Sequence, residues 1–305
     1  MNYCFGVDIG GTTVKIGLFE ETGTIVEKWE IPTNTLADGE AILPDIAFSL
    51  KTKIEERKLS EEDILGIGVG VPAPVTAEGI VNGSANLGWK YKEVKKEMEE
   101  LTGLKAYIGN DANVAALGEM WKGGGAGEKN MIMVTLGTGV GGGVIIDGKM
   151  LVGNNGAGGE IGHITVRNDE TETCGCGRKG CLEQYASATG LVRLTKRYFE
   201  KNTKNSILNK KEITAKEVFD AAKAALEITE EFGAYLGQAL VNLAATVDPA
   251  VFVIGGGVSK AGDILLDIVR KYFYDHAFYG NQKTKILLAT LGNDAGIYGA
   301  AKQVL

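Results

Sequence analysis

The sequence predicts an α/β protein made of two similar domains with a cleft between them. Two stretches of the 305-residue chain, starting at residues 7 and 134, are built alike: an apolar run, a Gly/Thr cluster and a second apolar run. Each is followed by a turn, a third strand-like segment, helical patterns and a further strand. A strand meander, helix, strand and helix used twice is typical of two packed α/β domains, which often bind a ligand between them.

The first hundred residues predict the elements of one domain. Ile42, Ile46 and Leu50 recur every four residues, which predicts a helix with one apolar face. The run from Ile64 ends at Pro72 and predicts a buried parallel strand followed by a turn. The expected elements are strands at about 3–9, 14–19 and 24–31, a helix from residue 42, a strand at 64–71, a helix at 92–102 and a strand at 105–109.

From about residue 130 the same order begins again. Ala250–Ile254 predicts a strand that enters a Gly turn and then a helix near 262–273. The last stretch, 294–305, is rich in small residues and predicts a helix that packs closely on its neighbours. We therefore expect a small domain over 1–115, to which the helix 294–305 returns, and a large domain over 116–293 with a metal-binding insert.

Charge and hydropathy exclude several classes of partner. The chain has 32 Lys and Arg against 39 Asp and Glu, a net charge of −7, with no basic run. Because phosphate backbones and anionic membranes favour clustered cations, we expect neither nucleic acid nor membrane as a partner. Asp8 interrupts the first apolar segment, which excludes a signal peptide and a membrane span there. We expect the protein in the cytoplasm.

The Gly/Thr clusters predict a nucleotide site. Glycine lets backbone N–H groups approach a ligand closely, and threonine adds hydroxyl donors, so two facing hairpins could hold a polyphosphate. Two ordinary hairpin turns are the alternative. The Gly turn after residue 254 could accept a phosphate or a flat ring at a helix start. The candidate nucleotide-binding residues are Asp8, Gly10, Gly11, Thr12, Thr13, Lys15, Gly137, Thr138, Gly139, Gly256 and Gly257.

Two acidic residues could take part in phosphoryl transfer. Asp8 stands where the second hairpin has Thr135, and a carboxylate beside phosphate-binding glycines suits Mg²⁺ held through water. Lys15 could offset phosphate charge or lie solvated. Asp111 follows a strand and begins a helix, so it either caps that helix or accepts a hydroxyl proton during phosphoryl transfer.

A cysteine cluster predicts a metal site. Three of the four cysteines, Cys174, Cys176 and Cys181, lie eleven or more residues after His163, one of only two histidines. Three thiolates and one imidazole match a closed structural zinc site, whereas buried free thiols are the alternative. Cys4 lies in the first strand and is expected in the core.

Taken together, these segments resemble the ROK family of sugar kinases and sugar-responsive repressors, within the actin-like (ribonuclease H-like) fold. The resemblance covers essentially the whole chain. It lies in the motifs Asp8-x-Gly-Gly-Thr-x-x-Lys15, Asn86-Leu-x-Trp89, Asn110-Asp111-Ala-Asn113, Leu136-Gly-Thr-Gly-x-Gly141, Gly159-Glu-x-Gly-His163 and Cys174-x-Cys-Gly-x-x-Gly-Cys-Leu-Glu183. One departure is Ala73, where the family often has glycine, which leaves the shape of one loop open.

The resemblance implies an ATP-dependent kinase, with Mg²⁺ and structural Zn²⁺, that phosphorylates D-glucose at the 6-hydroxyl and serves glycolysis and carbohydrate metabolism. It implies Asp111 as the general base and a homodimer or a dimer of dimers. It further implies that the sugar hydroxyls are bound by Asn86, Asn110, Asp111, Glu160, His163 and Glu183, and zinc by His163, Cys174, Cys176 and Cys181.

Alternatives of two kinds remain at this point. Another hexose could be the acceptor: N-acetylmannosamine, N-acetylglucosamine, mannose, allose or fructose. The repressors of the family carry a helix-turn-helix before the first meander, and this chain has two residues there and an acidic pI of about 5.2. We therefore expect an enzyme rather than a non-enzymatic sugar sensor.

Overall fold

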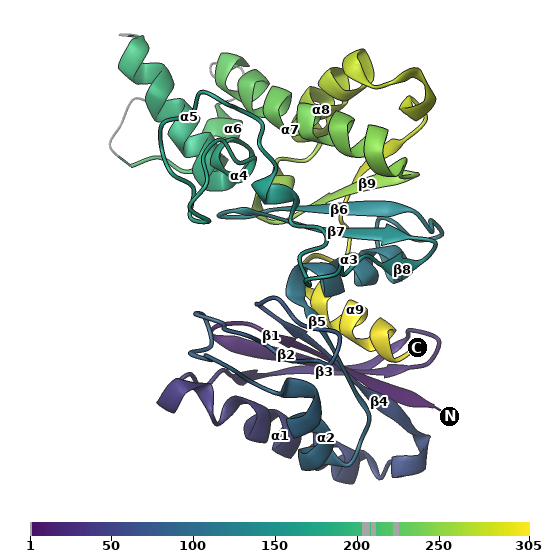
Figure 1. Cartoon of the computed structure of the whole chain (residues 1–305). Helices are drawn as coiled ribbons and strands as arrows, with labels where there is room; N and C mark the ends of the chain where they lie inside the picture. The colour runs from purple at the N-terminus through teal and green to yellow at the C-terminus, as the bar shows by residue number, and fades with distance from the viewer. Residues whose placement is uncertain (1, 203–207, 209–211, 222–225) are drawn as a thin grey trace. The chain divides into compact units, whose positions relative to one another are not determined.

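The computed structural model describes residues 2–202, 208, 212–221 and 226–305, which form two five-stranded sheets in two compact units (Figure 1). The first unit comprises Met1–Gly127, Met150–Gly158 and Asn293–Leu305, and the second comprises Glu128–Lys149 and Gly159–Gly292. The expected division after residue 115 falls inside helix α3 (Asp111–Lys122), which lies wholly in the first unit.

The sheet of the first unit has the strand order β3-β2-β1-β4-β5. Strands β1, β2 and β3 form an antiparallel meander, whereas β4 and β5 run parallel to β1. The carboxyl ends of β1, β4 and β5 therefore meet at one edge. The elements are β1 (Tyr3–Ile9), β2 (Thr13–Glu20), β3 (Ile25–Pro32), α1 (Ile42–Arg57), β4 (Ile64–Val71), α2 (Val94–Thr102), β5 (Ala106–Asn110), α3 and α9 (Ala295–Val304).

Alternation along β1 gives the sheet two different faces. Phe5, Val7 and Ile9 are buried in the cluster that includes the apolar faces of α1 and α2. Cys4 points to the other face and packs with Ile297 on α9, so this cysteine is in the core as predicted. Figure 1 shows α1 and α2 on one side of this sheet and α9 on the other.

Helix α9 approaches the sheet and α3 so closely that backbone as well as side chains are in contact. A Cβ on Gly6 would lie 2.0 Å from the carbonyl oxygen of Ile297, and one on Gly68 would lie 1.7 Å from that of Ala300. A Cβ on Gly299 would lie 1.6 Å from the carbonyl oxygen of Val114 on α3. These glycines allow the approach that brings α9 against β1, β4 and α3.

The sheet of the second unit has the order β10-β9-β6-β7-β8, which, read from β8, repeats the order of the first sheet read from β3. The predicted doubling is therefore present in the topology. The third strand of the second meander, β8, has only two residues. The elements are β6 (Met131–Leu136), β7 (Val140–Ile146), β8 (Lys149–Met150), α4 (Glu183–Ala186), α5 (Ala188–Lys201), α6 (Ala215–Asp220), α7 (Leu226–Val247), β9 (Val251–Gly255), α8 (Asp263–His276) and β10 (Lys285–Leu288).

Two helices begin or end differently from the prediction. The spacing of Tyr185, Ala188, Leu191 and Leu194 predicts one helix that starts at Glu183. The structure interrupts it at Ser187, whose extended backbone (ψ 173°) ends α4 while its Oγ caps α5 at the N–H of Gly190. A 3₁₀ turn over Gly257–Ala261 lies between the Gly turn and α8. Gly262, with φ 64°, separates that turn from the helix.

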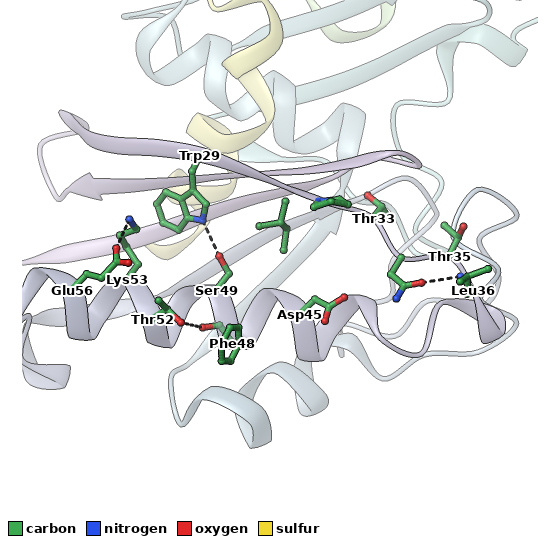
Figure 2. Close-up of a pocket in the computed structure, with 13 residues that line it drawn as sticks. Trp29, Thr33, Thr35, Leu36, Asp45, Phe48, Ser49, Thr52, Lys53 and Glu56 are labelled. Carbon is green, nitrogen blue, oxygen red and sulfur yellow. Dashed lines mark hydrogen bonds and ion pairs between the residues drawn. The ribbon is translucent and has the colours of Figure 1, made fainter.

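A hollow of about 810 Å³ lies between β3 and α1 in the first unit (Figure 2). Trp29 forms part of its wall and donates its indole N–H to Ser49 Oγ at 2.9 Å. None of the residues predicted for a functional site lines it. In the described part of the chain, no helix is both long and apolar enough to cross a membrane.

The contact between α9 and α3 gives the first prediction. Gly299→Ala should lower the free energy of unfolding by about 2–4 kcal/mol, because its Cβ would overlap the Val114 carbonyl and force the helices apart. Urea unfolding measures the change. Gly103→Ala is the control: its φ is +76° with no atom within 4 Å of the new Cβ, so it should cost only about 1 kcal/mol. Equal losses in the two variants would contradict the close-packing account.

Candidate functional site

The residues predicted for the site divide between the two units, and each group is described within its own unit. The first unit holds Asp8, Gly10, Gly11, Thr12, Thr13, Lys15, Asn86, Asn110 and Asp111. The second unit holds Gly137, Thr138, Gly139, Glu160, His163, Cys174, Cys176, Cys181, Glu183, Gly256 and Gly257.

The turn between β1 and β2 is tight and lies beside the Asn86 loop. The N–H of Gly10 donates to the carbonyl oxygen of Thr13 at 3.0 Å. A Cβ on Gly11 would lie 3.6 Å from the carbonyl oxygen of Asn86 and 3.8 Å from its Cβ. The first predicted phosphate turn is thus next to a residue predicted to bind the sugar, although the two lie more than seventy positions apart in sequence.

Asp8 is a carboxylate in a confined place. It pairs across the hairpin with Lys15, and Gly296 in the first turn of α9 leaves room for it, since a Cβ there would lie 2.4 Å from Asp8 Oδ2. Burial raises the pKa of Asp8 to about 6, and the nearby charge of Asp111 raises it, while Lys15 opposes the rise. A bound cation would favour the ionised form, so this position suits the predicted Mg²⁺.

Lys15 is held at the same edge of the sheet. Its ammonium group donates to the carbonyl oxygen of Asn293 at 3.2 Å, just before α9. Whether it meets a phosphate stays a prediction.

Asn110, not Asp111, caps α3. Asn110 Oδ1 accepts from the N–H groups of Ala112 and Asn113 at 3.0 and 3.2 Å, and its Nδ2 donates to the carbonyl oxygen of Ala73 at 3.2 Å. Asp111 is the first helical residue, with Oδ1 held by the N–H of Ala112 at 2.8 Å. Because its neighbour already provides the cap, the capping alternative does not explain why an acid stands at 111.

The two glycine turns of the second unit lie together. A Cβ on Gly256, whose φ is 84°, would lie 2.5 Å from the carbonyl oxygen of Leu136, at the end of β6. A Cβ on Gly139 would lie 2.6 Å from Glu183 Oε2. Thr135 Oγ1, at the position that corresponds to Asp8, is buried with no hydrogen-bond partner in the described residues. The hairpin, the Gly256 turn and Glu183 therefore form one group.

A pocket of about 300 Å³ adjoins this group and was not predicted from sequence. It is formed where α6 faces the 3₁₀ turn after β9, and Phe219 supplies an aromatic wall. The sequence signalled only its Gly257 end, as a place where a flat ring could enter, because no motif marks α6. Its lining residues are Ala188, Ala215, Lys216, Phe219, Asp220, Gly257, Val258, Lys260 and Ala261.

The predicted metal ligands converge. One ligand atom each from His163, Cys174, Cys176 and Cys181 lies within 4.8 Å of the others. The Sγ atoms of Cys176 and Cys181 are 3.6 Å apart, and Cys174 Sγ is 3.9 Å from His163 Nδ1. A tetrahedral ion with ordinary Zn–S and Zn–N bonds requires ligand separations of about 3.6–3.8 Å. These residues could therefore hold such an ion with little movement.

Glu183 touches the metal cluster. Its Oε1 accepts from Cys174 Sγ at 2.9 Å and lies 3.8 Å from His163 Nδ1. Burial, then the hydrogen bond to Glu183, raises the pKa of Cys174 to about 12, so a cation is needed to hold this group as a thiolate. Glu160 is exposed and directly precedes the 3₁₀ turn Ile161–His163.

Comparison with known proteins extends these observations to the whole chain. The family model described as "ROK family" matches residues 4–305. A curated glucokinase from Halalkalibacterium halodurans is 44% identical over 304 residues, covering 96% of this chain and 92% of that protein. A glucokinase from Streptomyces coelicolor is 36% identical over 320 residues, covering 99% and 97%. The crystal structure of a ROK family glucokinase from Streptomyces griseus, in complex with glucose and AMPPNP, has a TM-score of 0.75 at 34% identity and covers 99% of this chain and 98% of that one.

The raised pKa of Asp8 gives a prediction for stability. The folded protein binds this proton more tightly than the unfolded chain, so ionisation of Asp8 destabilises the fold as the pH rises toward 6. Asp8→Asn should therefore be more stable than the wild type without Mg²⁺ or nucleotide, by about 1–3 kcal/mol above pH 6.5 and by little at pH 4. Urea unfolding at several pH values measures the difference.

The exposed Asp267 provides the control, since Asp267→Asn should give no such pH-dependent gain. An advantage of Asp8→Asn that does not change between pH 4 and pH 6.5 would contradict the burial argument.

Proposed function

Because the chain belongs to the ROK family, we propose that it is an ATP-dependent glucokinase that phosphorylates D-glucose at the 6-hydroxyl, with Asp111 as the general base. The observation that carries this proposal is similarity over almost the whole length to glucokinases, one of which was crystallised with glucose and AMPPNP. The activity is that of a sugar kinase.

The glycine turns are suited to the nucleotide. In our proposal, the turns Gly10–Thr13 and Gly137–Gly139 bind the phosphates of ATP, and Asp8 would bind Mg²⁺ through water. The adenine ring would enter the 300 Å³ pocket beside Gly256 and Gly257, against Phe219. Lys15 would offset phosphate charge. The unpartnered Thr135 hydroxyl supports a polar ligand near the end of β6.

The sugar would be bound by side chains that pair with neutral hydroxyls. Each hydroxyl is both donor and acceptor, so carboxylates, amides and an imidazole are natural partners. We propose that the sugar hydroxyls are bound by Asn86, Asn110, Asp111, Glu160, His163 and Glu183.

Asp111 would remove the proton of the 6-hydroxyl as the phosphoryl group is transferred. The transition state is loose, so positioning and charge neutralisation count for more than base strength, and an ordinary ionised carboxylate is adequate. The hydrogen bond from the N–H of Ala112 to Oδ1, at 2.8 Å, fixes the carboxylate at the start of α3. A positioned base contributes a rate factor of about 10²–10⁴.

We further propose that His163, Cys174, Cys176 and Cys181 hold zinc. With four protein ligands the ion would have no open position, so its function is structural. When bound, it would fix Glu183 and the Glu160 turn relative to each other, because His163 belongs to that turn and Cys174 touches Glu183.

The proposal also covers the choice of sugar, the oligomeric state and the location in the cell. The other candidate acceptors differ from glucose in the configuration of a hydroxyl (mannose, allose), in an N-acetyl group at position 2 (N-acetylmannosamine, N-acetylglucosamine) or in being a ketose (fructose). A hydrogen-bonding site discriminates strongly against a substrate that lacks a hydroxyl at the expected place. We propose a homodimer or a dimer of dimers, and we propose the cytoplasm as its location, since ATP and the hexose are available there.

Asp111→Asn tests the base directly. It keeps the shape and the hydrogen bond to Ala112, yet it should lower kcat for glucose about 10²–10⁴-fold while the Kd for glucose changes less than about threefold. A coupled assay and calorimetric binding measure the two quantities. Asp45→Asn, on the exposed face of α1, is the control and should keep full activity. A loss below tenfold would remove Asp111 from this role.

Removing zinc should loosen the sugar site. Chelation, with metal loss verified by elemental analysis, should raise the KM for glucose about 10–100-fold, because Glu183 and His163 lose their common anchor. The KM for ATP should change little. Unchanged glucose affinity in verified zinc-free protein would contradict the structural role, and restoration by added Zn²⁺ shows that the loss is not irreversible damage.

A further inference from the structure

We infer that Glu170 is a positioning residue for sugar binding: its buried carboxylate joins the metal loop, defined as residues 172–181, to the helices that carry and follow Glu183. The inference rests on the proposed function, in which Glu183 binds the sugar. It concerns a residue that belongs to none of the motifs above.

Glu170 lies at the centre of a buried charge cluster. Its side chain is 2% exposed. Arg197 on α5 makes a two-pronged contact, at 3.0 Å to Oε2 and 2.9 Å to Oε1. Arg193 on α5 and the hydroxyl of Tyr185 on α4 also donate to Oε2. These donors, Arg197 above all, hold the pKa of Glu170 well below its usual range. The carboxylate is thus a fixed anion that binds two helices at once.

The same carboxylate also fixes the start of the metal loop. Glu170 Oε1 accepts from the N–H groups of Thr171 and Glu172 at 2.8 and 2.9 Å. Gln184 then joins both ends of the loop: its Nε2 donates to the carbonyl oxygen of Glu172, and its Oε1 accepts from the N–H of Cys181, each at 3.1 Å. Both ends of the loop are therefore bound to Gln184, the residue that directly follows Glu183.

These contacts control where Glu183 points. Helix α4 has only four residues, too few to hold an orientation by its own hydrogen bonds. Tyr185, two residues after Glu183, is fully buried against Tyr235 of α7, with ring centroids 4.2 Å apart, and its hydroxyl ends on Glu170. Loss of the Glu170 charge would weaken the hold on Tyr185 and leave both arginines paired with the exposed Glu172, and it would thereby loosen the Glu183 carboxylate and the nearby Cys174.

Glu172 provides a matched control. It pairs with the same Arg193 and Arg197, but its side chain is 56% exposed. Pairs with an exposed carboxylate contribute little because water screens them, whereas the loss of a buried carboxylate partner is costly. Glu170→Gln and Glu172→Gln make the same chemical change two positions apart, so they separate the buried contact from the general loss of one negative charge.

We expect Glu170→Gln to raise the KM for glucose about 10–100-fold and to speed zinc release to a colorimetric chelator by a similar factor. The kcat and the KM for ATP should change less than about threefold, because Asp111 belongs to the first unit and Glu183 meets the hairpin turn at its last residue, Gly139. Glu172→Gln should leave all four quantities within about twofold. Glu170→Asp, which keeps the charge, should recover part of the glucose affinity.

Equal effects in the two Gln variants, or an unchanged glucose KM and zinc release in Glu170→Gln, would overturn the inference. A kcat loss as large as the KM change would indicate general disruption instead and would also overturn it. If the Glu170→Gln variant does not fold, the Glu170→Asp variant decides the question. A folded Glu170→Asp variant with the wild-type KM for glucose and the wild-type rate of zinc release would contradict the need for the Glu170 contacts. Absence of glucose turnover in the wild type would refute the proposed function, while zinc release would still test Glu170.

Discussion

The convergence of one histidine and three cysteines is the constraint on which the positions of His163 and Glu183 in the second unit depend. Between the 3₁₀ turn that ends at His163 and the start of α4 at Glu183, the chain forms only isolated bridges, such as Thr165 with Cys181 and Thr173 with Lys179. Regular hydrogen-bond ladders therefore do not hold this stretch. Its shape rests on the cluster of ligands and on the buried charges around Glu170, and the positions of His163 and Glu183 follow from that shape.

In the first unit, regular secondary structure positions the candidate site residues. Asp8, Asn110 and Asp111 lie at the carboxyl ends of β1 and β5, which share one edge of the sheet because both strands run parallel to β4. Helix α9 reaches this edge through backbone contacts that only glycine permits, and Gly296 leaves the space that Asp8 occupies. Asp8 is thereby held partly buried and close to the charge of Asp111, an arrangement that costs stability and suits a cation.

Much of this account could be predicted from the sequence because repeats and motifs are local. The doubled meander, the Gly turns and the Cys₃His set are each visible in short segments, and the structure contains the doubling and the converged ligands. The break at Ser187 could not be predicted, because an apolar pattern continues across it and only the capping of α5 ends α4. The sequence did not show that Asn110 rather than Asp111 caps α3, because Asp and Asn are both good N-cap residues.

Features that depend on distant partners were also beyond the sequence. The domain boundary expected after residue 115 lies within α3. The whole of α3 belongs to the first unit because it packs against α9. Phe219 belongs to a segment without a motif. Glu170 stands in the run Asp169 to Glu172, which looks like a solvated acidic surface; its arginine partners lie 23 and 27 residues further on. Contacts of this range become visible only when the chain is folded.

The measurement that tests the central claim most directly is a comparison of initial rates with Mg·ATP across a panel of hexoses, with the product of the best acceptor identified by NMR. Our account predicts the highest kcat/KM with D-glucose and a product phosphorylated at the 6-hydroxyl. Preferential turnover of an N-acetylhexosamine would contradict the assignment of the substrate, and binding of sugar without turnover of any hexose would contradict the assignment of the chain as a kinase.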